Sequence, residues 1–267
     1  MRKLILRLAG SESLRKIVKF FQLHLLANWW LRCFPVVKIL PKSGIRYRAR
    51  RVESLGLSVE MFDRNELYSL ADLPPNTGSF ADLGCNVGYF TCWLCDQTGN
   101  RQMKGLMVDA NAEAIEDAQW HIKANHLSRV YALHGLVGTK SENGQASFFL
   151  HTSNVCSTAA PTDETLKNRN TWTHVQVPCL NLGKKWQHYF GDLQCDLLKI
   201  DIEGSEMDFF HNEPLFLKRT NAILVEWHKW HVTLLDLKTY LSGQGFALKK
   251  ILHENEGLGT ALFVRES

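Results

Sequence analysis

Long apolar runs are scarce in this sequence, which limits how it can meet a membrane. The uncharged stretch at residues 20–31 is shorter than the roughly 20 apolar residues that a membrane-spanning helix needs. Residues 1–13 lack both the uninterrupted apolar core and the small-residue cleavage site of a secretory signal. The sequence therefore predicts a cytoplasmic protein.

A regular cysteine pattern and a strong charge bias are also missing. The seven cysteines are an odd number at irregular spacings in a chain of 267 residues, which favours reduced thiols over a disulfide scaffold. Cys92 and Cys95 form a single CxxC with no second pair, so we expect packing there rather than zinc or redox chemistry. The net charge of +4 is too mild to indicate nucleic-acid binding, and we expect no nucleic-acid partner.

The N-terminal region has an amphipathic pattern. Within residues 14–40, apolar side chains recur at helical spacing with basic residues on their flanks, which predicts one or two helices. Such a helix can pack on the rest of the protein, the interpretation we favour, or lie on a membrane surface. We assign residues 1–43 to a helical extension, with peripheral membrane contact through residues 1–40 as the alternative.

The proline pair Pro74-Pro75 is the clearest break in the chain. Before it, residues 44–75 form a lead-in, in which we expect a short β segment and then a helix starting near Asp63. After it, residues 76–267 form the main domain. Residues 141–185 interrupt this domain with two strand-like segments, 146–151 and 175–182, around a polar stretch. An insertion of this kind is either a substrate lid or an ordinary loop.

Strands and helices alternate through the rest of the main domain. The expected strands are 79–83, 105–108, 130–133, 196–200 and 222–227, and the expected helices begin at residue 88 or cover 112–125, 207–217 and 234–242. This alternation predicts an α/β fold, a Rossmann-like, doubly wound, mostly parallel sheet with helices on both faces. Residues 246–252 and 260–265 are expected to close the sheet as an antiparallel hairpin.

The turn after the first of these strands reads Asp82-Leu-Gly84-Cys-Asn86-Val-Gly88. Its glycines allow a tight turn and a close approach of the backbone to a ligand. Dinucleotide-binding turns read G-x-G-x-x-G and leave a helix N-terminus open to a pyrophosphate. Here the middle glycine is missing, and the Asp82 carboxylate would repel a pyrophosphate. It suits a ligand with an ammonium and a sulfonium, and S-adenosylmethionine carries both.

A second acid, Asp109, ends the next strand, where a carboxylate reaches the ribose hydroxyls of a nucleoside ligand. We expect Asn111 to assist it. The predicted cofactor is therefore S-adenosylmethionine, and its predicted binding residues are Asp82, Gly84, Asn86, Gly88, Asp109 and Asn111. The alternative is that the two acids cap neighbouring helices.

Two later strands carry a family resemblance. The fourth core strand reads Leu197-Leu-Lys199-Ile-Asp201-Ile-Glu203-Gly204-Ser-Glu206, and the next reads Leu224-Val-Glu226-Trp-His228. They resemble the FkbM family of methyltransferases, whose members share a Lys-Ile-Asp-Val-Glu-Gly-x-Glu-like motif. The resemblance covers about residues 44–264. It implies a class I methyltransferase fold, S-adenosylmethionine as cofactor, and O-methylation of hydroxyls on sugars, polyketides and related metabolites. The chain departs from the family at Asp109, where Glu is more common, and in its Trp-rich N-terminal segment.

The end of the fourth strand supplies candidate catalytic groups. Lys199, Asp201 and Glu203 alternate along it and so face one side, at the rim where such sheets bind ligands. We predict Asp201, Glu203 and His228 as catalytic residues. His228 suits the role of general base near neutral pH, with Asp201 or Glu203 as the base in its place or as the group that orients it. No metal is expected, because no carboxylate spacing supports a metal bound by His228 and His231.

Three other functions stay open beside methyl transfer to a hydroxylated small molecule. An RNA 2′-O-methyltransferase would use a similar Lys/Asp/Glu site, but the mild charge argues against it. A nicotinamide-dependent oxidoreductase has the same kind of sheet, but its G-x-G-x-x-G turn is missing. A non-catalytic module recruited to membranes or partners by its N-terminal helix would not need the intact cofactor turn.

Overall fold

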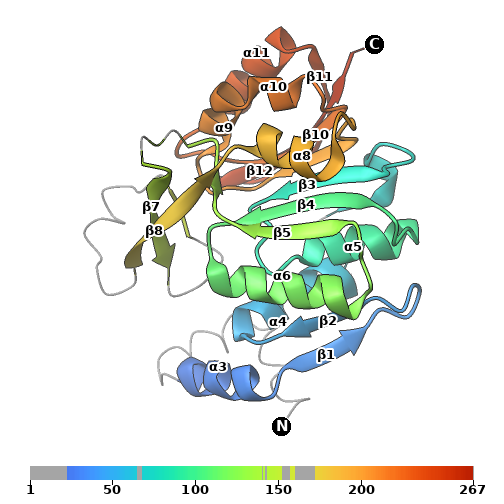
Figure 1. Cartoon of the computed structure of the whole chain (residues 1–267), viewed down its shortest axis with the longest axis vertical. Helices are drawn as coiled ribbons and strands as arrows, with labels where there is room; N and C mark the ends of the chain where they lie inside the picture. The colour runs from blue at the N-terminus through green and yellow to red at the C-terminus, as the bar shows by residue number, and fades with distance from the viewer. Residues whose placement is uncertain are drawn as a thin grey trace.

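A computed structural model describes residues 23–64, 68–139, 141, 143–151, 157–159 and 172–266 of the chain. Within these residues the main sheet has seven strands in the order β11-β12-β10-β9-β3-β4-β5 (Figure 1). Its strands are β3 (Ser79–Leu83), β4 (Lys104–Asp109), β5 (Val130–His134), β9 (Leu197–Ile200), β10 (Ala222–His228), β11 (Phe246–Glu254) and β12 (Leu258–Arg265). Neighbouring strands from β10 to β5 are parallel, whereas β12 pairs antiparallel with both β10 and β11. The predicted doubly wound sheet and its closing hairpin are both present.

The central strands of the sheet are buried on both faces because helices cover both sides. In β3, Phe80 packs into one core cluster with Trp93 of α5, while the next residue, Ala81, packs into the other with Trp186 of α8. The helices are α5 (Tyr89–Thr98), α6 (Ala112–Ala124), α8 (Leu182–Phe190), α9 (Glu206–Asn212), α10 (Pro214–Leu217) and α11 (Leu234–Gly243). The helix expected at 207–217 is two helices, because Pro214 cannot continue the first one.

The region before Pro74 differs from two expectations. Its elements are α3 (Leu23–Cys33), β1 (Val36–Ile39), β2 (Arg46–Ala49), α4 (Val52–Ser58), the π-helix η1 (Val59–Arg64) and the 3-10 helix η2 (Leu70–Asp72). Residues 36–39 are a strand where a helix was expected, since Pro35 ends the helical stretch and β-branched residues follow it. The helix expected to start near Asp63 starts at Val52 and ends at Arg64. The part of the predicted helical extension before residue 23 lies outside the described residues.

This N-terminal region is tied to the main domain through α6 (Figure 1). Asn125 accepts the Arg46 N–H at 2.6 Å and donates to the Arg46 carbonyl at 2.7 Å. Buried Asp117 binds the guanidinium groups of Arg48 and Arg50 at 2.6 and 2.8 Å. These contacts fix the β1–β2 hairpin along α6, and α3 and α4 flank this hairpin at the side of the carboxyl ends of the central strands (Figure 1).

The insertion at 141–185 contributes a second, small sheet. Strands β6 (Leu136–Val137), β7 (Gln145–His151) and β8 (Trp172–Leu180) pair in the order β6-β8-β7. The second expected strand thus ends at Leu180, and Leu182 opens α8, whose first turn is capped by the Asn181 side chain. Most of the polar stretch between β7 and β8 lies outside the described residues. No helix within the described ranges is long and apolar enough to cross a bilayer.

Candidate active site

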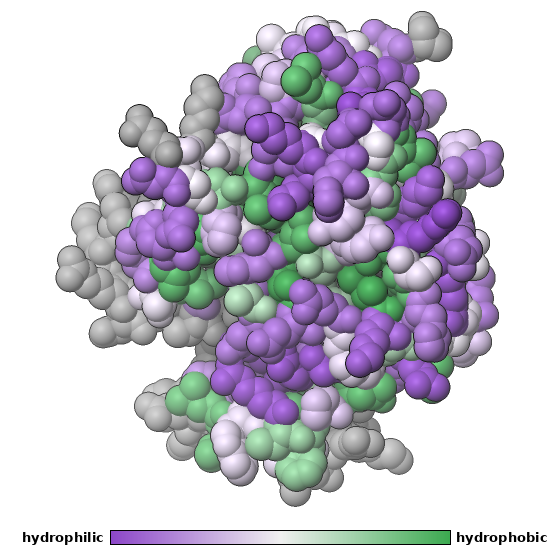
Figure 2. Space-filling view, in the orientation of Figure 1, coloured by the Kyte–Doolittle hydropathy of each residue, from purple (hydrophilic) through white to green (hydrophobic). Residues whose placement is uncertain are grey.

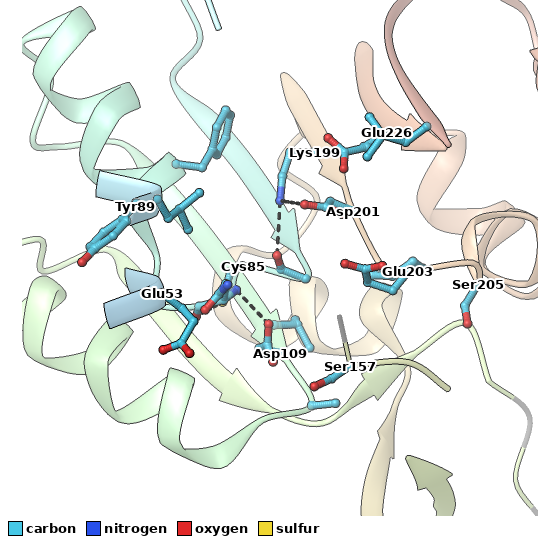
Figure 3. A pocket seen from close by; sticks show the side chains of 18 of the residues that line it. Glu53, Cys85, Tyr89, Asp109, Ser157, Lys199, Asp201, Glu203, Ser205 and Glu226 are labelled. Atoms are coloured by element: carbon cyan, nitrogen blue, oxygen red, sulfur yellow. Dashed lines mark hydrogen bonds and ion pairs between the residues drawn. The ribbon is translucent and has the colours of Figure 1, made fainter. Parts of the chain in front are cut away.

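A cavity of about 920 Å³ lies at the carboxyl ends of β3, β4, β9 and β10. Ligands of open α/β sheets bind at this edge. Its floor is formed by the turn after β3 and by the ends of β9 and β10, as Figure 3 shows. The other walls come from α3, α4, η1, the small sheet and the closing hairpin. The cavity therefore draws on segments far apart in the sequence, and the N-terminal region is part of it.

The turn after β3 needs its glycines for packing. Gly84 has φ +68°, and a Cβ added there would stand 1.7 Å from the carbonyl oxygen of Asp201. Gly88 has φ +85°, and a Cβ there would stand 2.5 Å from the methyl carbon of Met107. Asn86, between them, also has positive φ, at 48°. Gly84 and Asn86 line the cavity, whereas Gly88 does not and serves the contact between α5 and its neighbours.

Asp109 is placed at the cavity and is held by backbone groups. One carboxylate oxygen accepts the Asn86 N–H at 2.7 Å and the other accepts the Asn111 N–H at 2.8 Å. Burial raises the pKa of Asp109, against the lowering effect of these two bonds. Asn111 itself is not part of the cavity lining: its side chain accepts the Glu113 N–H at 3.0 Å and caps α6.

Asp82 lies beneath the turn and not in the cavity lining. Its side chain is fully buried, with one oxygen 3.5 Å from the Lys199 ammonium and the other accepting the Thr91 hydroxyl at 3.3 Å. Lys199 also donates to the Gly84 carbonyl at 3.2 Å and to Asp201 at 3.3 Å. Burial alone would lower the pKa of Lys199, but Asp201 and Asp82 raise it well above its usual value. The structure thus places Asp82 as the buried partner of a lysine that supports the turn.

Asp201, Glu203 and His228 come together at one side of the cavity. Asp201 and Glu203 line it, while His228 is buried behind Glu203. His228 Nε2 is 3.2 Å from a Glu203 oxygen, and His228 Nδ1 is 2.9 Å from an oxygen of the fully buried Glu206. Glu203 has φ +52°, an uncommon conformation for a residue other than glycine, and its carbonyl accepts the Thr158 hydroxyl at 2.7 Å.

These contacts set unusual pKa values. Burial would lower the pKa of His228, but the hydrogen bond to Glu206 and the charge of Glu203 raise it to about 9. Burial, and then the charge of Asp201, raises the pKa of Glu203 to about 8 and that of Glu226 to about 7. Glu203 and Glu206, one next to each ring nitrogen, therefore favour the imidazolium form of His228, which can donate from both nitrogens. The carboxylates at the cavity, and not the histidine, have pKa values suited to accepting a proton.

The same group of side chains has donor atoms at metal-binding spacing. Ligand atoms of Asp201, Glu203 and His228 all lie within 4.8 Å of one another. A divalent cation could bind there only if His228 gave up its Nε2 proton, because a metal ligand must be unprotonated.

The sequence interpretation missed the residues that line the cavity from the N-terminal side. Glu53 and Glu60 of α4 and η1, and Tyr68 after them, face the same space as Asp109 and Asp201. Glu53 and Asp109, both labelled in Figure 3, line this one cavity although they belong to different parts of the chain. Only the helical spacing of residues 52–64 could have indicated a helix there, and nothing in that spacing says which face meets the sheet.

A comparison with models of protein families identifies the family of this chain. Residues 82–248, more than half of the chain, match the model of the methyltransferase FkbM domain. The chain belongs to the FkbM methyltransferase family. It is an S-adenosylmethionine-dependent methyltransferase, with the mostly parallel sheet expected of one.

Solved structures give similar folds at low identity. An FkbM methyltransferase from Methylobacillus flagellatus is 14% identical, with a TM-score of 0.48, over 80% of this chain and 53% of that one. TrmK from M. capricolum, in complex with S-adenosyl-homocysteine, is 12% identical, with a TM-score of 0.43, over 74% and 69% of the two chains. A SAM-dependent methyltransferase from Aquifex aeolicus is 11% identical, with a TM-score of 0.45, over 78% and 93%. A comparison with curated proteins gives no match.

The cavity of this FkbM methyltransferase suits the cofactor. S-adenosylmethionine carries an ammonium and a sulfonium, and the cavity is rich in carboxylates. These are Glu53, Glu60, Asp109, Asp201, Glu203 and Glu226, against Lys199 as the one lysine or arginine among the described lining residues. Asp109 is the carboxylate that would accept the ribose hydroxyls, because each of its oxygens keeps a lone pair beyond its backbone bond. Gly84 and Asn86 provide the backbone surface next to it.

Proposed function

We propose that this protein transfers a methyl group to a hydroxyl of a small-molecule acceptor, a sugar, a polyketide or a related metabolite. The observation that carries the proposal is the Glu203 carboxylate, which lines the cavity 3.2 Å from His228 Nε2, and whose pKa is raised by burial and by the charge of Asp201. A hydroxyl is a poor nucleophile until it loses its proton, and a base works best with a pKa near the working pH. Glu203 fits that requirement better than His228, the base favoured from the sequence.

Three side chains near the ends of β9 and β10 then have separate tasks. Bound S-adenosylmethionine supplies the methyl group. Glu203 accepts the proton of the acceptor hydroxyl, and the imidazolium of His228 holds the Glu203 carboxylate through its 3.2 Å contact. Glu206, on the other ring nitrogen, fixes the orientation of His228. His228 is therefore a positioning residue in this mechanism.

The charge of the cavity supports a small, non-phosphorylated acceptor. Among the lining residues that the structure describes, carboxylates outnumber the one lysine, and that lysine already binds Asp82 and Asp201. A phosphate group in the cavity would be repelled by these carboxylates. It would also lose its hydration shell without gaining an unpaired cationic side chain among the described lining residues. RNA and sugar phosphates are for this reason disfavoured as acceptors.

A turnover screen with paired variants tests the proposal. Purified protein is incubated with S-adenosylmethionine and a panel of hydroxylated metabolites, and S-adenosylhomocysteine formation is measured. With an accepted substrate, we expect Glu203→Gln to lower kcat by about 10²–10⁴-fold, the usual contribution of a general base. S-adenosylhomocysteine affinity should stay within about threefold, because Glu203 acts on the acceptor. Turnover by Glu203→Gln near the wild-type rate would contradict the assigned base.

The pH profile separates positioning from catalysis. We expect wild-type kcat/KM to rise with pH and to reach half of its plateau near pH 8, because Glu203 must lose its proton. In His228→Gln the rise should move to higher pH, since the cation that favours ionised Glu203 is gone. The plateau should remain within roughly tenfold of wild type.

Removal of divalent cations tests whether a metal takes part. Turnover should survive dialysis against EDTA. Loss of turnover that a divalent cation restores would instead favour a metal at Asp201, Glu203 and His228.

A further inference from the structure

Exposed large apolar side chains are concentrated in one short segment of the described chain. Half of those exposed in the described residues lie between positions 25 and 39. They are Leu25, Leu26 and Trp29 of α3, Phe34 after it, and Val37 and Ile39 of β1. We call these six residues the α3–β1 surface. Figure 2 shows apolar side chains gathered at the end of the molecule where Figure 1 places α3 and β1.

The exposure follows from how α3 is packed. Leu31 is fully buried in a small core with Val36 and Leu55, so this side of the helix is used for folding. Leu25, Leu26 and Trp29 lie on the opposite side, 57%, 66% and 64% exposed. A surface helix normally carries polar residues on that side. In β1 the alternation is the same, since Val36 is buried and Val37 and Ile39 are exposed.

Charge complementarity indicates which partner covers this surface. Residues 1–22, which lead directly into α3, contain six basic side chains and one acidic side chain, Glu12. Nearby basic residues of the folded part are already paired, such as Arg32 with Glu113 and Lys38 with Asp63. A cationic segment joined to an apolar surface with an exposed tryptophan matches an anionic lipid surface, where apolar side chains enter the headgroup boundary and cations attract the lipids.

We propose that the α3–β1 surface docks this methyltransferase onto an anionic phospholipid membrane. The same helix borders the active-site cavity, because His24 and Ala27 of α3 line it. Docking would hold the rim of the cavity at the level of the lipid headgroups. Membrane binding is independent of the proposed function, because it is measured without an acceptor and without turnover.

Vesicle sedimentation of the full-length protein tests the docking. We expect binding to phosphatidylcholine vesicles that contain phosphatidylglycerol, weaker binding to phosphatidylcholine alone, and release by salt. The triple variant Leu25→Gln/Leu26→Gln/Trp29→Gln should bind the anionic vesicles at least about tenfold more weakly, because its apolar contact is removed. Glutamine is a good helix former, so α3 itself should persist.

A matched control keeps the outcome decisive. Leu215→Gln/Leu235→Gln removes two equally exposed leucines, 71% and 70% exposed, outside the α3–β1 surface and should bind vesicles like wild type. Thermal melting and S-adenosylhomocysteine binding confirm that both variants are folded. Wild-type protein that ignores anionic vesicles, or a triple variant that binds them fully, would overturn the docking surface. So would a wild-type dimer in lipid-free sedimentation velocity that the triple variant loses, since a second copy would then cover this surface.

Discussion

Replacing Asp82 by alanine separates two roles for the first acid of the cofactor turn. The sequence predicts that its carboxylate meets the cofactor, whereas the structure buries it completely against Lys199 and Thr91. If the buried contact is its role, Asp82→Ala removes one partner of a buried cation and leaves the cavity lining intact. The variant should then lose stability first, and cofactor affinity only slightly.

The size of the effect follows from the partners that Lys199 keeps. Breaking a buried ion pair by removing one partner costs about 3–5 kcal/mol. Lys199 retains Asp201 at 3.3 Å and the Gly84 carbonyl at 3.2 Å, so the lower end, about 3 kcal/mol, applies. The entropy of unfolding, about 2.1 cal/mol/K per residue, gives about 0.56 kcal/mol/K for 267 residues. We therefore expect Tm to fall by about 5 °C.

Calorimetry and thermal melting provide the assay. Titration with S-adenosylhomocysteine at a temperature where both proteins are folded should give Asp82→Ala an affinity within about fivefold of wild type. Asp109→Asn is the contrasting variant: its amide can accept only one of the two backbone N–H groups, so Tm falls here too, but it should bind S-adenosylhomocysteine at least about tenfold more weakly, since a charged acceptor for the ribose hydroxyls is lost. An Asp82→Ala protein with unchanged Tm and more than tenfold weaker binding would refute the buried role of Asp82.

Two further predictions test the packing and the electrostatics of the site. Gly84→Ala should destabilise the fold far more than Gly99→Ala: both glycines have φ near +67°, but a Cβ at Gly84 meets the Asp201 carbonyl at 1.7 Å, while nothing lies within 4 Å at Gly99. Comparable melting temperatures for the two variants would contradict the close approach of the strands. For Glu226, burial and the charge of Asp201 raise the pKa from 4.5 to about 7, so wild-type stability falls as pH rises through that interval. Glu226→Gln should therefore gain Tm relative to wild type at about pH 8 and gain none at about pH 4.5, measured by melting across this range.

Sequence periodicity predicted the main sheet because its central strands are buried on both faces. Strands such as Ser79–Leu83 and Leu197–Ile200 are short, mostly apolar runs next to turn signals, and such runs in alternation with helices identify a parallel sheet. The same reasoning failed at residues 36–39, where a four-residue stretch with three apolar residues fits a helix as well as a strand. The strand forms because it pairs with Arg46–Ala49, and that pairing is fixed by contacts with α6 nearly 80 residues away.

The cofactor turn shows how far local sequence can identify a site. Gly84, Asn86 and Asp109 were predicted as a group, and the structure places all three at the cavity. The motif could not reveal that Asp109 lines the cavity while Asp82 is buried. Side chains along a strand point to alternate faces of the sheet, and the burial of Asp82 depends on Lys199, which belongs to another strand. Lys199, 115 residues after Gly84, supplies the charge that lets Asp82 be buried.

The sequence alone could not predict whether His228 or Glu203 acts as the base, again because contacts made only in the folded protein determine the answer. An unperturbed histidine titrates near neutral pH and an unperturbed glutamate near 4.5, so composition alone favours His228 as the base. In the folded protein Glu203 is better suited than His228 to act as the base. Glu203 and Glu206, one at each ring nitrogen, stabilise the protonated form of His228 and raise its pKa. Burial and the charge of Asp201 raise the pKa of Glu203. The proton acceptor of such a site is set by how three strand-end side chains and one buried glutamate are arranged, and it is therefore a property of the fold.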